Sequence, residues 1–178
     1  GAGQCAATYG VGERAGQVEG DEALGQVRGV RIVWGQDVGK AIKRTALEGQ
    51  TDGGIMQGIG MALSEEVIFD RGQPVNTSLF NYRVPRIAEL PQIDVEFVET
   101  NDPQGPFGAK GAGEPTINAT LGAIANAVAD AVGVRFMRLP STPERVLEAL
   151  ARKRGTAAPS LKPLKRPYNA EVALVRAM

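Results

Sequence analysis

Two stretches of the chain carry the hydrophobic pattern of a β-strand. Residues 26–34 place apolar side chains at short intervals with an interruption at Gly29, which predicts a half-buried strand with an irregularity. The turn-forming residues 35–37 should end it. Residues 93–97 alternate between apolar and acidic side chains, the clearest strand pattern in the sequence. Residues 7–11 offer a weaker start of another strand.

Three stretches have apolar residues at helical spacing. Residues 55–63 place them on one face, and residues 121–132 do so again, with Gly133 in the position of a C-terminal cap. A third helix is predicted around residues 146–150, because residues 141–144 read as a capping box with proline in the first turn.

The first of these helices is unusually rich in glycine. It carries Gly54, Gly58 and Gly60, and each glycine in a helix interior costs roughly 0.5–1 kcal/mol relative to alanine. We expect close packing against another backbone or a ligand as the compensation. The residues that follow, 70–74, read as a turn.

Strands and helices in mixed order predict an α+β fold, in which a mixed sheet packs against helices. Residues 1–25 are rich in small residues and have no clear period, and residues 101–115 read as a loop dense in glycine and proline. We expect one domain over residues 1–151. Residues 152–178 are basic and carry prolines, which indicates an exposed tail.

Composition excludes several kinds of function. The 20 basic and 20 acidic residues cancel to a net charge of zero, so no global field attracts nucleic acid or a membrane surface. The absence of histidine and the single Cys5 exclude a disulfide framework, a histidine-bearing zinc site and Ser-His or Cys-His catalysis. Cys5 is expected to be a small buried residue. No apolar run approaches the ~20 residues of a membrane-spanning helix.

Acid–base chemistry near neutral pH must therefore use a carboxylate or a lysine, and the loop at residues 106–115 offers both. Its glycines let the backbone approach a ligand, and they present Lys110 and Glu114 immediately before a helix. Pro115 should limit Glu114 to extended conformations. A buried carboxylate in this position can act as a general base. The alternative is that Glu114 is an ordinary acid in the first turn of a helix.

Two other features of the sequence are less specific. The glycine-rich loop could bind a phosphate on its backbone amides, but its spacing matches neither common phosphate-binding fingerprint. Gln50 lies in a Glu-Gly-Gln sequence near a helix start. Such a glutamine is usually a solvated polar residue, although its amide can donate and accept hydrogen bonds at the edge of a heterocycle.

Three motifs together resemble a known family. Residues 48–60 begin Glu-Gly-Gln-Thr-Asp-Gly-Gly, residues 81–85 read Asn-Tyr-Arg-Val-Pro, and residues 108–115 read Gly-Ala-Lys-Gly-Ala-Gly-Glu-Pro. In this order and at these separations they resemble the C-terminal part of the molybdenum-binding subunit of the xanthine dehydrogenase and aldehyde oxidase family. Residues 142–147 resemble the closing helix of bacterial members. The resemblance runs from about residue 7 to residue 150.

The resemblance implies part of a molybdenum hydroxylase, an oxidoreductase that hydroxylates an electron-poor carbon of a purine-like N-heterocycle or an aldehyde with oxygen from water. Glu114 would be the general base. Gln50, Gly111 and Gly113 would line the molybdenum–molybdopterin cofactor, in the plain or the cytosine dinucleotide form, and no protein side chain would ligate the metal. Lys110 would support the loop.

The family also implies partners, because one cysteine cannot hold an iron–sulfur cluster. These partners are the remainder of the molybdenum-binding subunit, an iron–sulfur subunit and an FAD subunit, together in the cytoplasm. Other cofactor-binding segments of the family have no counterpart here, and residues 12–17 replace its usual strand. The start at Gly1 indicates a chain that is processed, trimmed or a piece of something longer. With these segments missing, we expect a separate subunit of a split enzyme or a fragment of a longer one. A non-catalytic interaction module is the alternative.

Overall fold

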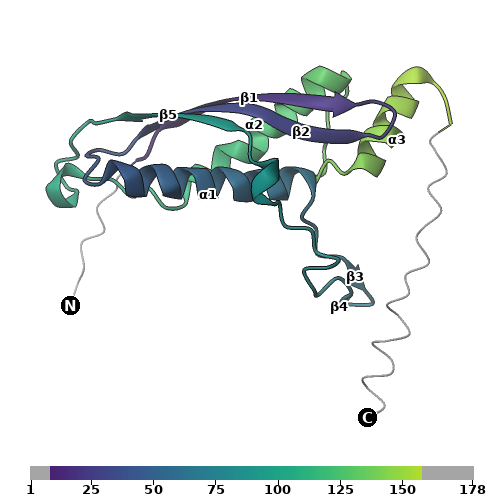
Figure 1. The fold of residues 1–178 in the computed structure, drawn as a ribbon, viewed down its shortest axis with the longest axis horizontal. Helices are drawn as coiled ribbons and strands as arrows, with labels where there is room; N and C mark the ends of the chain where they lie inside the picture. The colour runs from purple at the N-terminus through teal and green to yellow at the C-terminus, as the bar shows by residue number, and fades with distance from the viewer. Residues whose placement is uncertain (1–8, 158–178) are drawn as a thin grey trace, which may run out of the picture.

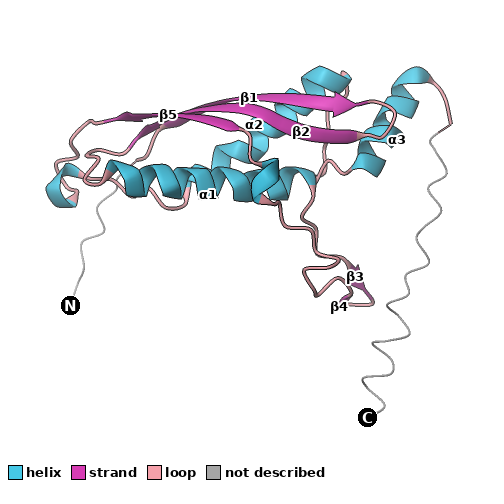
Figure 2. Cartoon of the chain, in the orientation of Figure 1, coloured by secondary structure: helices cyan, strands magenta, loops and turns pink. Residues whose placement is uncertain are grey.

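The computed structural model describes residues 9–157. A three-stranded sheet carries helices on one face, and a small hairpin projects away from it (Figures 1 and 2). The sheet contains β1 (Gly12–Asp21), β2 (Gln26–Asp37) and β5 (Gln92–Val98). Its strand order is β1-β2-β5, with β1 antiparallel and β5 parallel to β2. The mixed sheet with packed helices confirms the predicted α+β fold.

Two long helices and a shorter one pack against the sheet. They are α1 (Arg44–Leu63), α2 (Pro115–Val132) and α3 (Pro143–Arg154). The core lies between the sheet and these helices, and its buried apolar residues come from β2, α1, α2 and α3 (Ile32, Trp34, Ile55, Ile59, Ala62, Ile124, Val128, Val132, Val146, Leu150). On the opposite face of the sheet Val33 is 42% exposed, so only one face is covered.

β2 confirms the predicted irregularity but not the predicted end. The register with β1 shifts so that Gly29 and Arg31 pair with successive β1 residues and Val30 forms a bulge. The strand continues through residues 35–37, where a turn was expected. Gln36 pairs with Gly12 on one side and with Phe97 on the other, and pairing on both sides overrides the local turn preference.

β1 was not predicted, although it is ten residues long. Every second residue of β1 turns toward the helices, and these residues include Arg14 and Gly16. Because neither is apolar, the strand lacks the alternation of apolar and polar residues by which a strand is recognised. Residues 9–11, part of the weaker strand predicted at 7–11, precede β1, while residues 1–8, with Cys5, lie outside the described part of the chain.

α1 begins earlier than the apolar pattern indicates. The Glu-Gly-Gln motif at residues 48–50, expected as a loop near a helix start, lies inside it. The predicted close packing of its glycines is confirmed. A Cβ at Gly54 would lie 2.6 Å from the Cβ of Thr116, and one at Gly58 would lie 2.6 Å from the Cβ of Thr120. Glycine therefore brings α1 and α2 into backbone contact.

The remaining elements largely follow the sequence. α2 ends at Gly133, whose φ of 69° is the expected left-handed cap. The turn predicted at 70–74 joins β3 (Phe69–Asp70) to β4 (Gln73–Pro74). Two 3-10 helices are also present, at Ile87–Glu89 and Pro106–Gly108.

The capping box predicted before α3 does not form. The N-cap is Thr142 rather than Ser141, and its side chain makes no capping hydrogen bond. Arg145 takes the N3 position and its guanidinium binds Glu66 at 2.8 Å. α3 also runs to Arg154, three residues into the predicted tail, and residues 158–178 lie outside the described part. No helix in residues 9–157 is long and apolar enough to cross a membrane.

Candidate functional site

The motifs meet at one end of the sheet. β2 and β5 are parallel, so their carboxyl ends lie at the same edge, and the segments that follow them lead into α1 and α2. In open sheets with parallel strands, ligands bind outside these carboxyl ends. The predicted site residues follow these two strands, Gln50 on α1 and Gly111, Gly113 and Glu114 in the loop before α2.

The loop after β5 is attached to the segment after β2 by its backbone. Lys110 N–H donates to the carbonyl of Val38, and Asn101 N–H donates to the carbonyl of Gly39, both at 2.8 Å. Gly39 has a φ of 67°, and a Cβ there would lie 2.9 Å from the nitrogen of Lys110. This close approach requires glycine.

A mostly buried ion pair fixes the same loop. Lys110 Nζ lies 2.6 Å from Asp37 Oδ2, and the two side chains are only 13% and 11% exposed. Nζ also donates to the carbonyl of Tyr9 at 3.0 Å. This geometry agrees with the expected supporting role of Lys110.

Asp37 accepts more than this one hydrogen bond. Gly39 N–H donates to it at 2.8 Å and the Thr100 hydroxyl at 2.9 Å. Burial alone would raise the pKa of Asp37, but the hydrogen bonds from Lys110, Gly39 and Thr100 and the charge of Lys110 together lower it. The carboxylate therefore stays ionised and holds three segments of the chain together.

The Gly-Glu-Pro motif is held from both sides. The carbonyl of Gly113 accepts hydrogen bonds from Gln50 Nε2 at 3.1 Å and from Thr116 Oγ1 at 2.8 Å. The carbonyl of Pro115 accepts one from the guanidinium of Arg14. The carbonyls of the two residues on either side of Glu114 are thus fixed by side chains from α1, α2 and β1, and the structure brings Gln50, Gly113 and Glu114 together.

Arg14 is itself held by stacking. Its guanidinium carbon lies 3.5 Å from the ring centroid of Trp34, a cation–π arrangement. Burial lowers the pKa of Arg14 to about 10. Sequence reasoning missed Arg14, Asp37 and Thr116. Asp37 had been assigned to a turn, and no sequence pattern marks Arg14 or Thr116 as part of this site.

Glu114 differs from its expectation in two respects. Its φ of −81° and ψ of −28° are helical rather than extended, although it is the N-cap of α2 and this position usually has extended dihedrals. Ile117 N–H donates to the carbonyl of Glu114 at 3.0 Å. This hydrogen bond stabilises the helical conformation of Glu114 even though a proline follows it. Its side chain is exposed and makes no hydrogen bond or ion pair within residues 9–157. The burial expected of a general base is therefore not supplied by the described residues.

The surface around Glu114 has room for a ligand. A Cβ added at Gly111 or Gly113 would meet no atom within 4 Å, so neither glycine is needed for packing and both backbones are accessible. Gln50 is exposed and uses only its Nε2 group toward Gly113, which leaves its amide oxygen available. An open glycine backbone beside an amide fits a polar cofactor such as a pterin. In residues 9–157 no three His, Cys, Asp or Glu side chains gather as a metal site.

The chain matches known proteins over most of its length. The family model of a molybdopterin cofactor-binding domain matches residues 1–91. A putative xanthine dehydrogenase molybdenum-binding subunit of Escherichia coli is 43% identical over 130 residues, which are 72% of this chain and 17% of the relative.

Solved structures agree with this match. The aldehyde oxidoreductase from Desulfovibrio gigas superposes with a TM-score of 0.73 at 38% identity, over 79% of this chain and 15% of that one. Quinoline 2-oxidoreductase from Pseudomonas putida gives 0.71 at 36% identity, over 75% and 17%. The chain spans less than a fifth of the length of each of these proteins. It belongs to the molybdopterin cofactor-binding domain family, within the xanthine dehydrogenase and aldehyde oxidoreductase group.

Proposed function

We propose that this chain forms part of the active site of a molybdenum hydroxylase, with Glu114 as the general base. The observation that carries the proposal is the carbonyl of Gly113, which accepts hydrogen bonds from both Gln50 and Thr116. Through it, the Glu-Gly-Gln and Gly-Glu-Pro motifs, 63 residues apart in sequence, form one rigid surface. An exposed carboxylate stands on that surface next to accessible glycine backbone.

Gln50, Gly111 and Gly113 are the residues that would hold molybdenum–molybdopterin. The amide oxygen of Gln50 can accept a hydrogen bond from the pterin while its Nε2 remains on Gly113, and the two glycines admit the cofactor without a side chain in the way. When bound, this group supplies the two-electron oxidation of the substrate. We leave the plain and cytosine dinucleotide forms of the cofactor as alternatives.

Glu114 would accept the proton that water loses as its oxygen is transferred to the substrate carbon. A carboxylate serves this purpose best when its pKa lies near the working pH. Since Glu114 is exposed among the described residues, its burial in the enzyme would come from cofactor, substrate and the rest of the subunit. The fixed carbonyls of Gly113 and Pro115 keep its backbone in place before they arrive.

The relatives indicate the class of substrate and partner. Their names refer to xanthine, aldehyde and quinoline oxidation, so we propose an electron-poor carbon of an N-heterocycle or an aldehyde as the site of hydroxylation. The E. coli relative is called a molybdenum-binding subunit. We therefore propose that this chain works with the remainder of such a subunit and with iron–sulfur and FAD subunits in the cytoplasm.

A non-catalytic interaction module is the second candidate. The exposure of Glu114 within residues 9–157 favours it, because a scaffold does not require a buried base. However, a scaffold also has no need for two accessible glycines beside a carboxylate. The two candidates differ in what the carboxylate does in the assembled protein.

Glu114→Gln in the assembled enzyme separates them. We expect turnover to fall by ~10²–10⁴-fold, the usual contribution of a general base, while molybdenum and pterin contents stay unchanged. The matched control is Glu144→Gln, because Glu144 is an exposed acid in the proline-bearing first turn of α3. Turnover near wild type in Glu114→Gln, with molybdenum retained, would show that Glu114 is not the base.

A further inference from the structure

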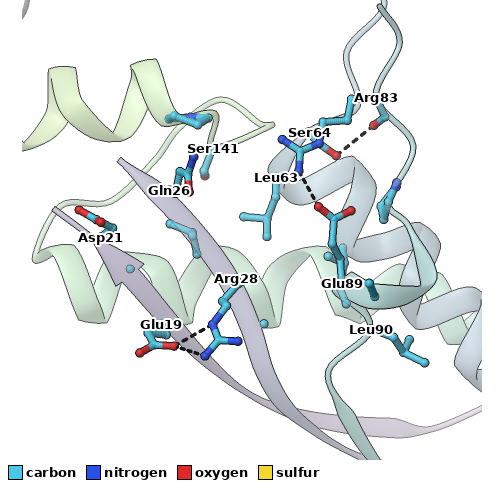
Figure 3. Close-up of a pocket in the computed structure, with 17 residues that line it drawn as sticks. Glu19, Asp21, Gln26, Arg28, Leu63, Ser64, Arg83, Glu89, Leu90 and Ser141 are labelled. Carbon is cyan, nitrogen blue, oxygen red and sulfur yellow. Dashed lines mark hydrogen bonds and ion pairs between the residues drawn. The ribbon is translucent and has the colours of Figure 1, made fainter. Parts of the chain in front are cut away.

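A groove of about 690 Å³ lies at the other end of β2 from the candidate site. Its walls are the end of β1, the first residues of β2, the end of α1, the segment that contains Arg83 and Glu89, and the start of α3 (Figure 3). None of the residues proposed to bind the cofactor lines it. The groove is therefore a separate feature of the fold.

One wall of the groove is an open strand edge. β1 pairs with β2 from Gln26 to Gln36, but β5 pairs with it only from Arg31 onward. Pro91 precedes β5, and proline has no N–H with which to extend the ladder. A strand paired on one side presents alternate N–H and C=O groups on the other. Residues 26–30 therefore lack a partner strand on this side, and residues 26–29 of this edge line the groove.

The interior of the groove combines an apolar floor with one buried hydroxyl. Its apolar residues come from β2, α1 and the segment before β5 (Val27, Ile59, Leu63, Pro85, Ala88, Leu90). Ser141 is 2% exposed, and its Oγ has no hydrogen-bond partner in the described part of the chain. A buried hydroxyl is normally satisfied, so Ser141 points to a polar group from an occupant.

The rim of the groove carries two ion pairs and one further acid, Asp21, so its charges nearly cancel. Arg28 bonds to Glu19 at 2.7 Å, and Arg83 bonds to Glu89 at 2.5 Å (Figure 3). Such a rim does not select a strongly charged ligand. Together, the open edge, the apolar floor and the nearly balanced charges of the rim suit an extended peptide with apolar side chains, which binds by strand addition.

We propose that an extended segment of the molybdenum-binding subunit, from outside these 178 residues, adds a strand along residues 26–30 in line with β5. The inference rests on the proposed assembly. The E. coli relative is matched over only 17% of its length, so such a subunit has ample further polypeptide to fill the groove. The backbone of this segment would form hydrogen bonds with the free N–H and C=O groups at the β2 edge. One of its polar groups would form a hydrogen bond with the hydroxyl of Ser141.

Hydrogen–deuterium exchange tests the proposal directly. The full chain is compared alone and in the assembled enzyme, and we expect the outward-facing amides of residues 26–30 to exchange at least about tenfold more slowly in the assembly. The exposed hairpin of β3 and β4 is the internal reference. Unchanged exchange at residues 26–30, in an assembly that protects other segments, would overturn the proposal.

A pair of lysine substitutions tests the apolar floor. Leu63→Lys places a charge in the groove, whereas Met61→Lys is a control on an exposed position of the same helix, 41% exposed. We expect Leu63→Lys to weaken association with the rest of the subunit by at least about tenfold and Met61→Lys to leave it unchanged. Fluorescence of Trp34, the single tryptophan, verifies that both variants are folded. Equal association of the two folded variants would contradict the proposal.

The two proposals fail in different ways. Glu114→Gln should leave exchange at residues 26–30 and the association unchanged, because Glu114 does not line the groove. Full activity loss in that variant without protection of residues 26–30 would refute strand addition alone. Protection of residues 26–30 with undiminished turnover in Glu114→Gln would refute the catalytic assignment alone.

Discussion

At the scale of single residues, the carboxylate of Asp37 holds the candidate site together. It binds Lys110 from the loop that carries the Gly-Glu-Pro motif and Thr100 from the segment just after β5. Lys110 in turn reaches the carbonyl of Tyr9 before β1. One side chain thus connects segments that are far apart in sequence, and its ionisation should be measurable in the stability of the fold.

Asp37→Asn should destabilise the protein in a pH-dependent way. Because the folded pKa of Asp37 is lowered, its contribution is present above its unfolded pKa and is lost as pH falls through the folded value. We expect a loss of about 1.5–3 kcal/mol near neutral pH, the range for hydrogen bonds to charged groups, and little difference in strong acid. Urea unfolding, monitored by the fluorescence of Trp34, measures this loss of stability at each pH.

The control for this change is Asp130→Asn, because Asp130 is an exposed carboxylate on α2. It should unfold like the wild type at every pH. An Asp37→Asn variant with the same loss of stability in acid as at neutral pH would show that ionisation of Asp37 does not stabilise the loop.

The residues of the site were only partly predictable. Gln50, Gly111, Gly113 and Glu114 were indicated by motifs, because short sequences of unusual composition are visible without a structure. Arg14 was not, since its contribution depends on stacking over Trp34 and on reaching Pro115, 101 residues away. Contacts at that separation leave no local pattern in the sequence.

At the scale of elements, the contact between α1 and α2 positions the two motifs. Gly54 and Gly58 lie against Thr116 and Thr120, and the same Thr116 donates to the carbonyl of Gly113. The two helices can approach this closely only because one of them lacks side chains at the contact. The separation of Gln50 and Glu114 therefore depends on two glycines in α1.

Gly58→Ala should separate these helices. Its Cβ would lie 2.6 Å from the Cβ of Thr120, and such overpacking typically costs about 1–3 kcal/mol. Gly53→Ala is the matched control on the same helix, because a Cβ there meets nothing within 4 Å. It should stabilise the protein by about 0.5–1 kcal/mol. Equal unfolding midpoints for the two variants would contradict the proposed helix contact.

The start of α1 and the presence of β1 were not predicted from the sequence. The start of α1 was missed because three glycines between residues 49 and 54 weaken the local helix preference, whereas packing on α2 favours the helix. β1 was missed because it turns few apolar side chains inward. In contrast, β5 and α2 were predicted because each buries a regular apolar stripe.

At the scale of the whole molecule, the sheet presents two functional ends. The carboxyl ends of β2 and β5 carry the candidate active site, and the open edge at the start of β2 carries the groove. Several large apolar side chains in the described part are more than four-fifths exposed (Leu79, Phe80, Ile87, Phe107, Met137). Leu79 and Phe80 are neighbours in sequence, and adjoining exposed apolar side chains are expected where a larger assembly covers the surface.

The molybdenum content of the native complex is the most direct test of the account. The complex that contains this chain is isolated from its source, its polypeptides are identified, and molybdenum is measured per chain. We expect about one molybdenum for each copy, together with a larger polypeptide that supplies the remaining cofactor contacts. A folded chain that is isolated alone and without molybdenum would contradict the proposal that Gln50, Gly111, Gly113 and Glu114 line a molybdopterin site.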